Sequence, residues 1–200
     1  RGGLAGGATA GQPEAPRPVP LADGWLTPRG IDLDDMQRLR RAFADATKRS
    51  VDAGFESVEI HCAHGYLLQT FLSPLGNFRK DAYGGDLEGR MRLSLEIAED
   101  VRAALPDNLP LFVRISAVDA IEGGWEMEDS LTFSRELKAR GVDVIDCSSG
   151  GQSPKGPTNF KLVRETGYQV PYAAELPREV GLRSEERRGW EAGRCGRPRQ

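Results

Sequence analysis

Three short apolar runs, SVEIH (57–61), LFVRI (111–115) and VDVIDC (142–147), have the length and β-branched content typical of strands. Apolar residues at helical spacing separate them, over residues 87–105 and 127–140. Strands that alternate with helices favour a parallel sheet with right-handed crossovers. The sequence therefore predicts an α/β fold, with strands apolar enough to be buried on both faces.

A further helix is predicted before the first strand. Asp32 is suited to cap its start, with Asp35 three residues later, and Gly54 is placed to end it. Gly141 ends the 127–140 helix in the same way. Near the C-terminus, Pro177 argues against a helix after residue 171, because an interior proline costs about 3 kcal/mol.

The position of the strand ends gives the first indication of a site. The order of elements fits both an open doubly wound sheet and a (β/α)₈ barrel, and in either fold ligands bind at the C-terminal ends of the strands. Those ends carry His61, Arg114 and the pair Ser148-Ser149. We therefore expect functional side chains to meet there.

The chain of 200 residues is expected to form one domain with irregular ends. Residues 1–30 are rich in Gly, Ala and Pro and are predicted to be loop, as is the polar stretch 62–86. Residues 31–181 carry the alternating pattern. The tail, 182–200, is rich in Arg and has no apolar periodicity, so it is predicted to be disordered or not native to the fold.

Composition narrows the class of partner and the compartment. The net charge is -3 and the pI about 5.6, which disfavours nucleic acid and anionic membrane partners. No apolar run approaches the roughly 20 residues that span a bilayer, and the N-terminal stretch lacks the apolar core of an export signal. Three scattered cysteines are too few for a disulfide framework, so a cytoplasmic protein is expected.

Both histidines of the chain lie in the segment HCAH, at His61 and His64. With Cys62 they could contribute metal ligands, but no second Cys/His cluster completes a set of three or four, so no metal is expected. The two rings could instead bond only to nearby backbone. In the catalytic interpretation they donate hydrogen bonds to a carbonyl oxygen on which negative charge develops.

Two further residues are candidates for chemistry. Tyr66 follows His64 closely, and a tyrosine hydroxyl can deliver a proton, although packing of a loop is an alternative role. Arg114 lies within an apolar strand, where a guanidinium needs an anionic partner, either a carboxylate or an anionic cofactor. Cys62 has no evident activating base, and Cys147 is expected to be a small core residue.

Several segments, in order, resemble the signature of the Old Yellow Enzyme family. They are VEIHCAHGYLL (58–68), FLSP (71–74), NFR (77–79), DAYGG (81–85), EGR (88–90), VRISA (113–117) with Asp119, GG (123–124) and GVDVIDCSSGG (141–151). The segment GYQVPY (167–172) resembles the thermophilic-like ene-reductase branch. The resemblance covers residues 20–181, with departures at Gly89 and Asp86, where the family usually has Asn and Ser. Asp86 is still suited to cap the helix that follows it.

This resemblance implies a (β/α)₈ barrel that binds FMN, of which the chain carries strands four to six with their helices. It would then be a fragment of a longer enzyme, with a homo-oligomer possible for the full-length protein. His61 and His64 match the pair that binds the carbonyl oxygen of an α,β-unsaturated substrate, Tyr66 matches the proton donor, and Arg114 matches the arginine beside the flavin. The implied reaction uses NADPH or NADH to reduce FMN, which then reduces the substrate C=C bond.

Three alternatives stay open at this point. The chain could be a non-catalytic remnant of the barrel, because three strands cannot close an eight-stranded barrel. It could be a relative of the FMN and iron–sulfur dienoyl-CoA reductases, which share the barrel. It could also be a small metal-binding module built on His61, Cys62 and His64.

Overall fold

A computed structural model describes residues 13–20, 24, 26–151 and 166–186 of the chain. Four parallel strands form its main sheet, in the order β3 (Val58–Cys62), β4 (Leu111–Ser116), β5 (Val144–Ser148) and β6 (Arg183–Glu186). The helices are α1 (Leu33–Asp52), α2 (Leu67–Leu72), α3 (Leu87–Ala104), α4 (Met127–Ala139) and α5 (Val170–Glu179). The predicted α/β fold with parallel strands is confirmed, and the strand and helix bounds differ from the predicted ones by one or two residues.

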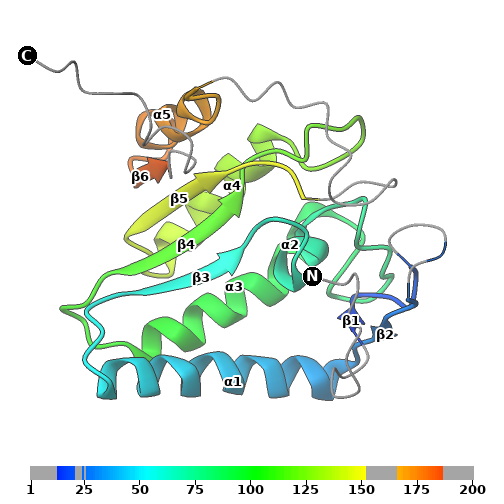
Figure 1. Cartoon of the computed structure of the whole chain (residues 1–200), viewed down its shortest axis with the longest axis horizontal. Helices are drawn as coiled ribbons and strands as arrows, with labels where there is room; N and C mark the ends of the chain where they lie inside the picture. The colour runs from blue at the N-terminus through cyan, green and yellow to red at the C-terminus, as the bar shows by residue number, and fades with distance from the viewer. Residues whose placement is uncertain (1–12, 21–23, 25, 152–165, 187–200) are drawn as a thin grey trace, which may run out of the picture.

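All four strands run in the same direction, so their C-terminal ends lie along one edge of the sheet (Figure 1). The short helix α2 lies beyond the end of β3, at that same edge, and α1 and α3 pack side by side below the sheet. The connection from each strand to the next passes through a helix, as parallel pairing requires. This arrangement brings the loops that follow β3, β4 and β5 together.

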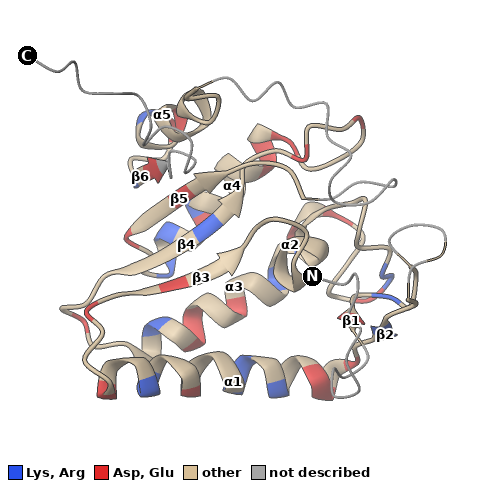
Figure 2. Ribbon diagram, in the orientation of Figure 1, with Lys and Arg blue, Asp and Glu red and all other residues tan. Residues whose placement is uncertain are grey.

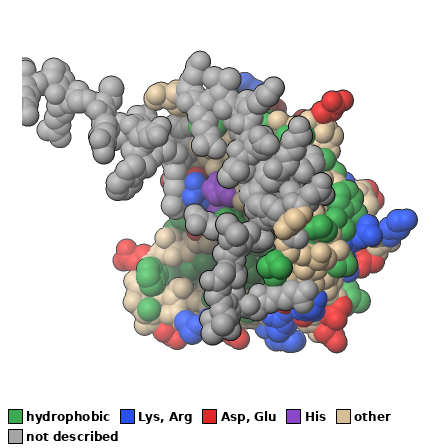
Figure 3. Space-filling model, turned by 45° about the vertical axis from the view of Figure 1, so that its right-hand side comes forward, with side chains coloured by type: hydrophobic (Ala, Val, Ile, Leu, Met, Phe, Trp, Pro, Cys, Tyr) green, Lys and Arg blue, Asp and Glu red, His purple; other side chains and the backbone are tan. Residues whose placement is uncertain are grey.

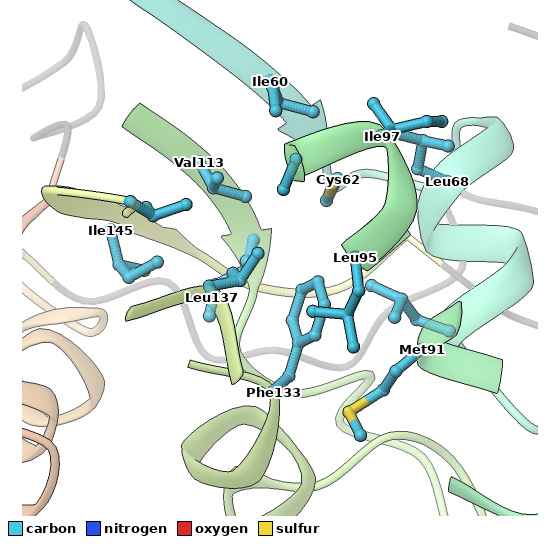
Figure 4. Packing of buried hydrophobic residues seen from close by; sticks show 14 of the residues in the cluster. Ile60, Cys62, Leu68, Met91, Leu95, Ile97, Val113, Phe133, Leu137 and Ile145 are labelled. Carbon is cyan, nitrogen blue, oxygen red and sulfur yellow. The ribbon is translucent and has the colours of Figure 1, made fainter. Parts of the chain in front are cut away.

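The core lies between one face of the sheet and the helices (Figure 4). Alternate strand residues point into it and are buried, among them Ile60, Val113 and Ile145. From the helices, Leu95, Ile97, Phe133 and Leu137 pack against them. Each such side chain contributes about 1.5–3 kcal/mol through burial, so this face holds the sheet and helices together.

The opposite face of the sheet is polar, which the sequence interpretation did not expect. Most residues between the core positions are polar: Glu59 and His61 on β3, Arg114 and Ser116 on β4, and Asp146 and Ser148 on β5, with Phe112 and Val144 at the N-terminal ends of their strands. Because strand side chains alternate, each strand has one apolar face and one face that is polar toward its C-terminal end. The expectation of strands that are apolar on both faces was therefore wrong, and the polar face is where the site is built.

The predicted helix caps are confirmed. Asp32 accepts a hydrogen bond from the Asp35 N–H, and the Asp35 carboxylate accepts one from the Asp32 N–H, which makes a capping box at α1. Asp86 caps α3 by accepting from the Gly89 N–H at 2.8 Å. Gly54 adopts a φ of 87° just past the end of α1. These short-range signals are local, so the sequence alone was sufficient to find them.

The doubt about a last helix was wrong, because α5 forms with Pro177 in its interior. Proline has no N–H, so the Ala173 carbonyl four residues earlier loses its helical partner. The Ser184 hydroxyl of β6 donates to that carbonyl instead. A contact from a distant part of the chain thus satisfies the group that the proline leaves unpaired.

Three segments predicted to be irregular contain regular structure. Within residues 1–30, β1 (Glu14–Ala15) pairs with β2 (Arg29–Gly30). Within 62–86, α2 forms over residues 67–72. Within the predicted tail, residues 183–186 form β6 and pair with β5, so for these four residues the prediction of disorder was wrong. The remainder of the tail, 187–200, lies outside the described residues.

Charged residues lie along the outer helices (Figure 2). Arg40 of α1 donates to both Asp100 carboxylate oxygens and to Glu96 of α3, at 2.6–3.1 Å, and ties the two helices together. No helix in the described part of the chain is long and apolar enough to cross a bilayer.

Candidate active site

The structure brings the four predicted site residues to the polar face, at the C-terminal edge of the sheet. His61 lies on β3 directly across from Arg114 on β4, and Arg114 lies across from Asp146 on β5. His64 and Tyr66 follow in the turn between β3 and α2. Figure 3 shows histidine surface beside basic side-chain atoms.

The His61 ring contacts the rings of both His64 and Tyr66. The His61 ring centroid lies 5.1 Å from that of His64 and 5.1 Å from that of Tyr66, with tilts of 55° and 59°. Tyr66 is 37% exposed, while His61 and His64 are partly buried. The group therefore offers two imidazoles beside a phenol that is open to solvent.

The Arg114 guanidinium lies over the same face. Its side chain is 18% exposed, and its Nε lies 3.4 Å from the Oδ2 of Asp146, which is fully buried. This Nε is buried and makes no hydrogen bond to a described residue. Arg114 thus has the carboxylate partner that the sequence interpretation required. Its Nε–H makes no hydrogen bond to a described residue and can still donate one.

The turn that carries His64 is held in an unusual backbone conformation. His64 has a φ of 61°, a region that costs a non-glycine residue about 1–2 kcal/mol. Its N–H donates to Ser116 Oγ at 3.1 Å, and Ser116 Oγ in turn donates to the Gly150 carbonyl at 2.5 Å. One hydroxyl thereby links the loops after β3, β4 and β5.

A buried carboxylate supports the same turn from below. Asp119 is fully buried and accepts hydrogen bonds from Gln69, Ser73 and the Trp125 N–H, at 2.5–2.9 Å. Gln69 then accepts from the Gly65 N–H, next to His64. Burial raises the pKa of Asp119, and the three donors oppose that rise. This chain of contacts fixes α2 and the His64 turn relative to β4.

The side chain of His64 is held as well. Its Nε2 lies 2.5 Å from Ser148 Oγ at the end of β5, and Gln169 Nε2 lies 3.2 Å from the same oxygen. Burial, together with the positive charge of Arg114 and the neighbouring His61, lowers the pKa of His64 to about 4. His64 is therefore a neutral imidazole near pH 7.

Neither cysteine in the described part of the chain suits a reactive role. Cys62 and Cys147 are buried in the core, and burial raises the pKa of the Cys62 thiol to about 12. Cys62 also points to the face opposite His61, because neighbouring strand residues alternate. The side chains of His61 and Cys62 therefore do not converge on one ion.

One group of acids has the spacing of possible metal ligands. Carboxylate oxygens of Glu59, Asp146 and Glu185 all lie within 4.8 Å of one another on the polar face. Arg114 also pairs with Asp146, so part of this negative charge already has a cationic partner. The group contains neither histidine and is separate from the contacts among the three rings.

The sequence interpretation missed the residues that position the site. Ser116, Gln69 and Gln169 act through hydrogen bonds that include contacts between segments far apart in the chain, and no local pattern marks such contacts. Ser148 was placed at a strand end, but no partner could be assigned to it. The positive φ of His64 was not predicted either, because histidine, although enriched several-fold among non-glycine residues at positive φ, adopts a negative φ at most positions.

The donor set fits the FMN that the family resemblance implies. A flavin presents carbonyl oxygens and ring nitrogens along its pyrimidine edge, and Arg114 has a buried Nε without a hydrogen bond to a described residue. The guanidinium shares a face with His61, so a ring held against Arg114 would lie beside the imidazoles.

Comparison with known proteins agrees with this architecture. A model of the family described as NADH:flavin oxidoreductase / NADH oxidase matches residues 11–153, more than half of the chain. The NADPH dehydrogenase of Geobacillus sp. (strain WCH70) is 40% identical over 168 residues, which cover 84% of this chain and 47% of that protein. The chain thus spans about half the length of this relative.

Solved structures show the same partial match. An Old Yellow Enzyme homologue from Zymomonas mobilis superposes with a TM-score of 0.70 at 25% identity, covering 90% of this chain and 51% of that one. Histamine dehydrogenase from Rhizobium sp. 4-9 superposes with a TM-score of 0.72 at 31% identity, covering 88% and 26%. The chain belongs to the NADH:flavin oxidoreductase family, the Old Yellow Enzyme family, and its fold corresponds to part of that family's barrel.

Proposed function

We propose that this chain is part of an FMN-dependent oxidoreductase that uses NADPH or NADH to reduce the C=C bond of α,β-unsaturated carbonyl compounds. The observation that carries the proposal is the contact of the His61 ring with both His64 and Tyr66, beside Arg114. Relatives about 40% identical are named NADPH dehydrogenase, which supports the reductant. A small unsaturated carbonyl compound is the proposed partner.

In this proposal the two imidazoles bind the substrate carbonyl oxygen. Reduction at the β-carbon moves negative charge onto that oxygen, and donors already in place there lower the barrier. Because His64 is neutral near pH 7, it donates as an uncharged imidazole and does not titrate during the reaction. The pair thus polarises the C=C bond through the carbonyl group.

Tyr66 is the proposed proton donor to the α-carbon. Its hydroxyl is on an exposed side chain next to His61, at the solvent side of the ring group. General acid catalysis of this kind contributes typically 10²–10⁴-fold in rate. A proton delivered to the α-carbon completes the reduction that a hydride at the β-carbon begins.

Arg114 is the proposed contact to the cofactor. Bound FMN supplies the hydride, and its reduced ring carries negative charge. A permanently charged guanidinium beside that ring favours the reduced form. Asp146 holds Arg114 from the adjacent strand and sets its position on the polar face.

Titration of the purified 200-residue chain with FMN tests whether this part of the barrel holds the cofactor. Absorbance and near-UV circular dichroism report a bound flavin, and a saturable signal supports a flavin site. Absence of binding favours the alternative of a non-catalytic remnant. Iron and sulfide analysis of the full-length protein separates the iron–sulfur relatives, whose cluster a simple ene-reductase lacks.

The substrate role is tested in the protein with a complete barrel. His61→Ala is expected to weaken phenol binding and slow enone reduction, while flavin stays bound. Phe55→Ala, at an exposed position just before β3, is the matched control and leaves both unchanged. Unchanged affinity and turnover in His61→Ala would end the assignment of that residue.

A further inference from the structure

The environment of the His64 ring is asymmetric. Its Nε2 faces the hydroxyl of Ser148, which is 4% exposed, at 2.5 Å. On the far side of that hydroxyl lies the amide of Gln169, 8% exposed, with its Nε2 at 3.2 Å. Three side chains from the ends of β3, β5 and the start of α5 therefore form one short hydrogen-bonded series.

The direction of each bond follows from what the groups can do. The Gln169 amide nitrogen only donates, and it also lies 3.4 Å from Ser149 Oγ and 3.1 Å from the Tyr168 hydroxyl, so hydroxyl oxygens surround it. Ser148 Oγ accepts from Gln169 and has one proton of its own to donate. Among described residues, the remaining partner of that hydroxyl is His64 Nε2.

The opposite arrangement is less favourable. If His64 Nε2 carried a proton, Ser148 would accept from both neighbours and its own buried proton would have no described partner. A buried polar group left in that state disfavours this tautomer by roughly tenfold in population. That difference is large enough to keep one form of the ring dominant.

We propose that Ser148 and Gln169 are positioning residues that hold His64 as the tautomer with its proton on Nδ1. For its consequence in catalysis this inference rests on the proposed function, because the Nδ1–H is then the donor available to a carbonyl oxygen. The other tautomer turns the Nδ1 lone pair toward that oxygen and repels it. A neutral imidazole has only one N–H, so its location decides whether His64 binds substrate.

The low pKa of His64 agrees with this assignment. Burial, Arg114 and His61 together lower the pKa to about 4, so the doubly protonated ring is rare near pH 7. The charged and titratable groups around the ring are Arg114 on β4 and His61 on β3, while Ser148, Ser116 and Gln169 are neutral. Tautomer choice therefore depends on hydrogen bonds and not on ionisation.

Nuclear magnetic resonance on the ¹⁵N-histidine-labelled chain tests the tautomer directly. The chain has only two histidines, so its long-range ¹H–¹⁵N spectrum contains two rings, and His61→Gln assigns them. The expected result is a His64 ring with Nδ1 protonated and Nε2 unprotonated. A wild-type His64 with its proton on Nε2 overturns the proposal without the need for any variant.

Variants then test whether Ser148 is the cause. Ser148→Ala is expected to shift the His64 nitrogen signals toward a mixture of tautomers, and Ser148→Thr, which keeps a hydroxyl, restores the wild-type pattern. Ser134→Ala is the matched control, since it removes an equally buried hydroxyl on α4 and leaves the spectrum unchanged. An unaltered His64 spectrum in folded Ser148→Ala shows that Ser148 does not select the tautomer.

Activity of the full-length enzyme tests the consequence. Ser148→Ala is expected to weaken phenol binding about tenfold, the loss of one hydrogen bond, with flavin still bound. Wild-type affinity in that variant overturns the catalytic consequence. If the spectra show the expected tautomer but the wild-type enzyme reduces no enone, the proposed function fails while the tautomer assignment stands.

Discussion

At the scale of single residues, the site depends on two loops that approach closely. A Cβ on Gly65 would lie 2.4 Å from the Gly151 carbonyl oxygen, and a Cβ on Gly151 would lie 2.3 Å from the Gly65 nitrogen. Only glycine at both positions permits this contact. The contact places the turn with His64 against the loop after Ser148, so two glycines set the distance across which that histidine and serine bond.

Gly65→Ala is therefore expected to destabilise the protein more than a comparable change elsewhere. Its φ of 73° and the backbone overlap add a left-handed penalty of about 1–2 kcal/mol to an overpacking cost of about 1–3 kcal/mol. Gly85→Ala is the matched control, because its φ of 78° is similar but nothing lies within 4 Å of its Cβ. Urea unfolding measures both, and equal losses of stability would refute the close approach.

The neutral state of His64 makes a pH prediction. Its pKa falls from about 6.5 in the unfolded chain to about 4 when folded, so between these values only the unfolded chain binds the proton. The free energy of unfolding should therefore decrease as the pH falls from about 6.5 toward 4. Urea midpoints at about pH 7.5 and about pH 5 measure this decrease. In His64→Gln the decrease is smaller, and an equal decrease would show that His64 titrates normally.

At the scale of secondary structure, the sequence was informative wherever the signal was local. The caps at Asp32 and Asp86 and the apolar runs of the strands were sufficient to place α1, α3 and the first three strands of the sheet. The prediction from the sequence failed for α5 and β6, because each of these two elements is stabilised by packing against the other. Residues 183–186 form a strand because they pair with β5 and pack against α5, although their composition does not favour a strand.

The contact between these two elements predicts energetic coupling. Ser184→Ala leaves the Ala173 carbonyl without a donor and is expected to cost about 1–3 kcal/mol. In the Pro177→Ala background the same change is expected to cost less, because Ala at 177 supplies a helical N–H to that carbonyl. A double-mutant cycle in urea measures the difference. Equal costs in both backgrounds would show that Ser184 does not compensate for the proline.

The residues that position the site show the limit of sequence reasoning. His61, His64, Tyr66 and Arg114 were identified because their chemistry stands out at strand ends, and the structure places them together. Ser116, Ser148 and Gln169 are ordinary polar residues, separated from His64 by tens of positions. Their importance comes from the parallel sheet that aligns the strand ends, which a single sequence does not display.

At the scale of the whole molecule, the sheet has two edges. Among described residues, β3 pairs only with β4 and β6 only with β5, whereas a closed barrel pairs every strand on both sides. An open edge presents unpaired backbone groups that recruit other strands. The chain also spans about half the length of the Geobacillus and Zymomonas relatives, so the described sheet corresponds to part of their barrel.

Hydrogen exchange is expected to show this difference between strands. Amide protons of β4 and β5, which have neighbours on both sides, exchange slowly and at a rate independent of protein concentration. Those of β3 and β6 exchange faster in dilute solution and become more protected as concentration rises, because the edges of two copies pair. Mass spectrometry of peptides covering the four strands, at two protein concentrations, measures the effect. Uniform protection of all four strands, unchanged by dilution, would mean that the edges are already covered within one chain.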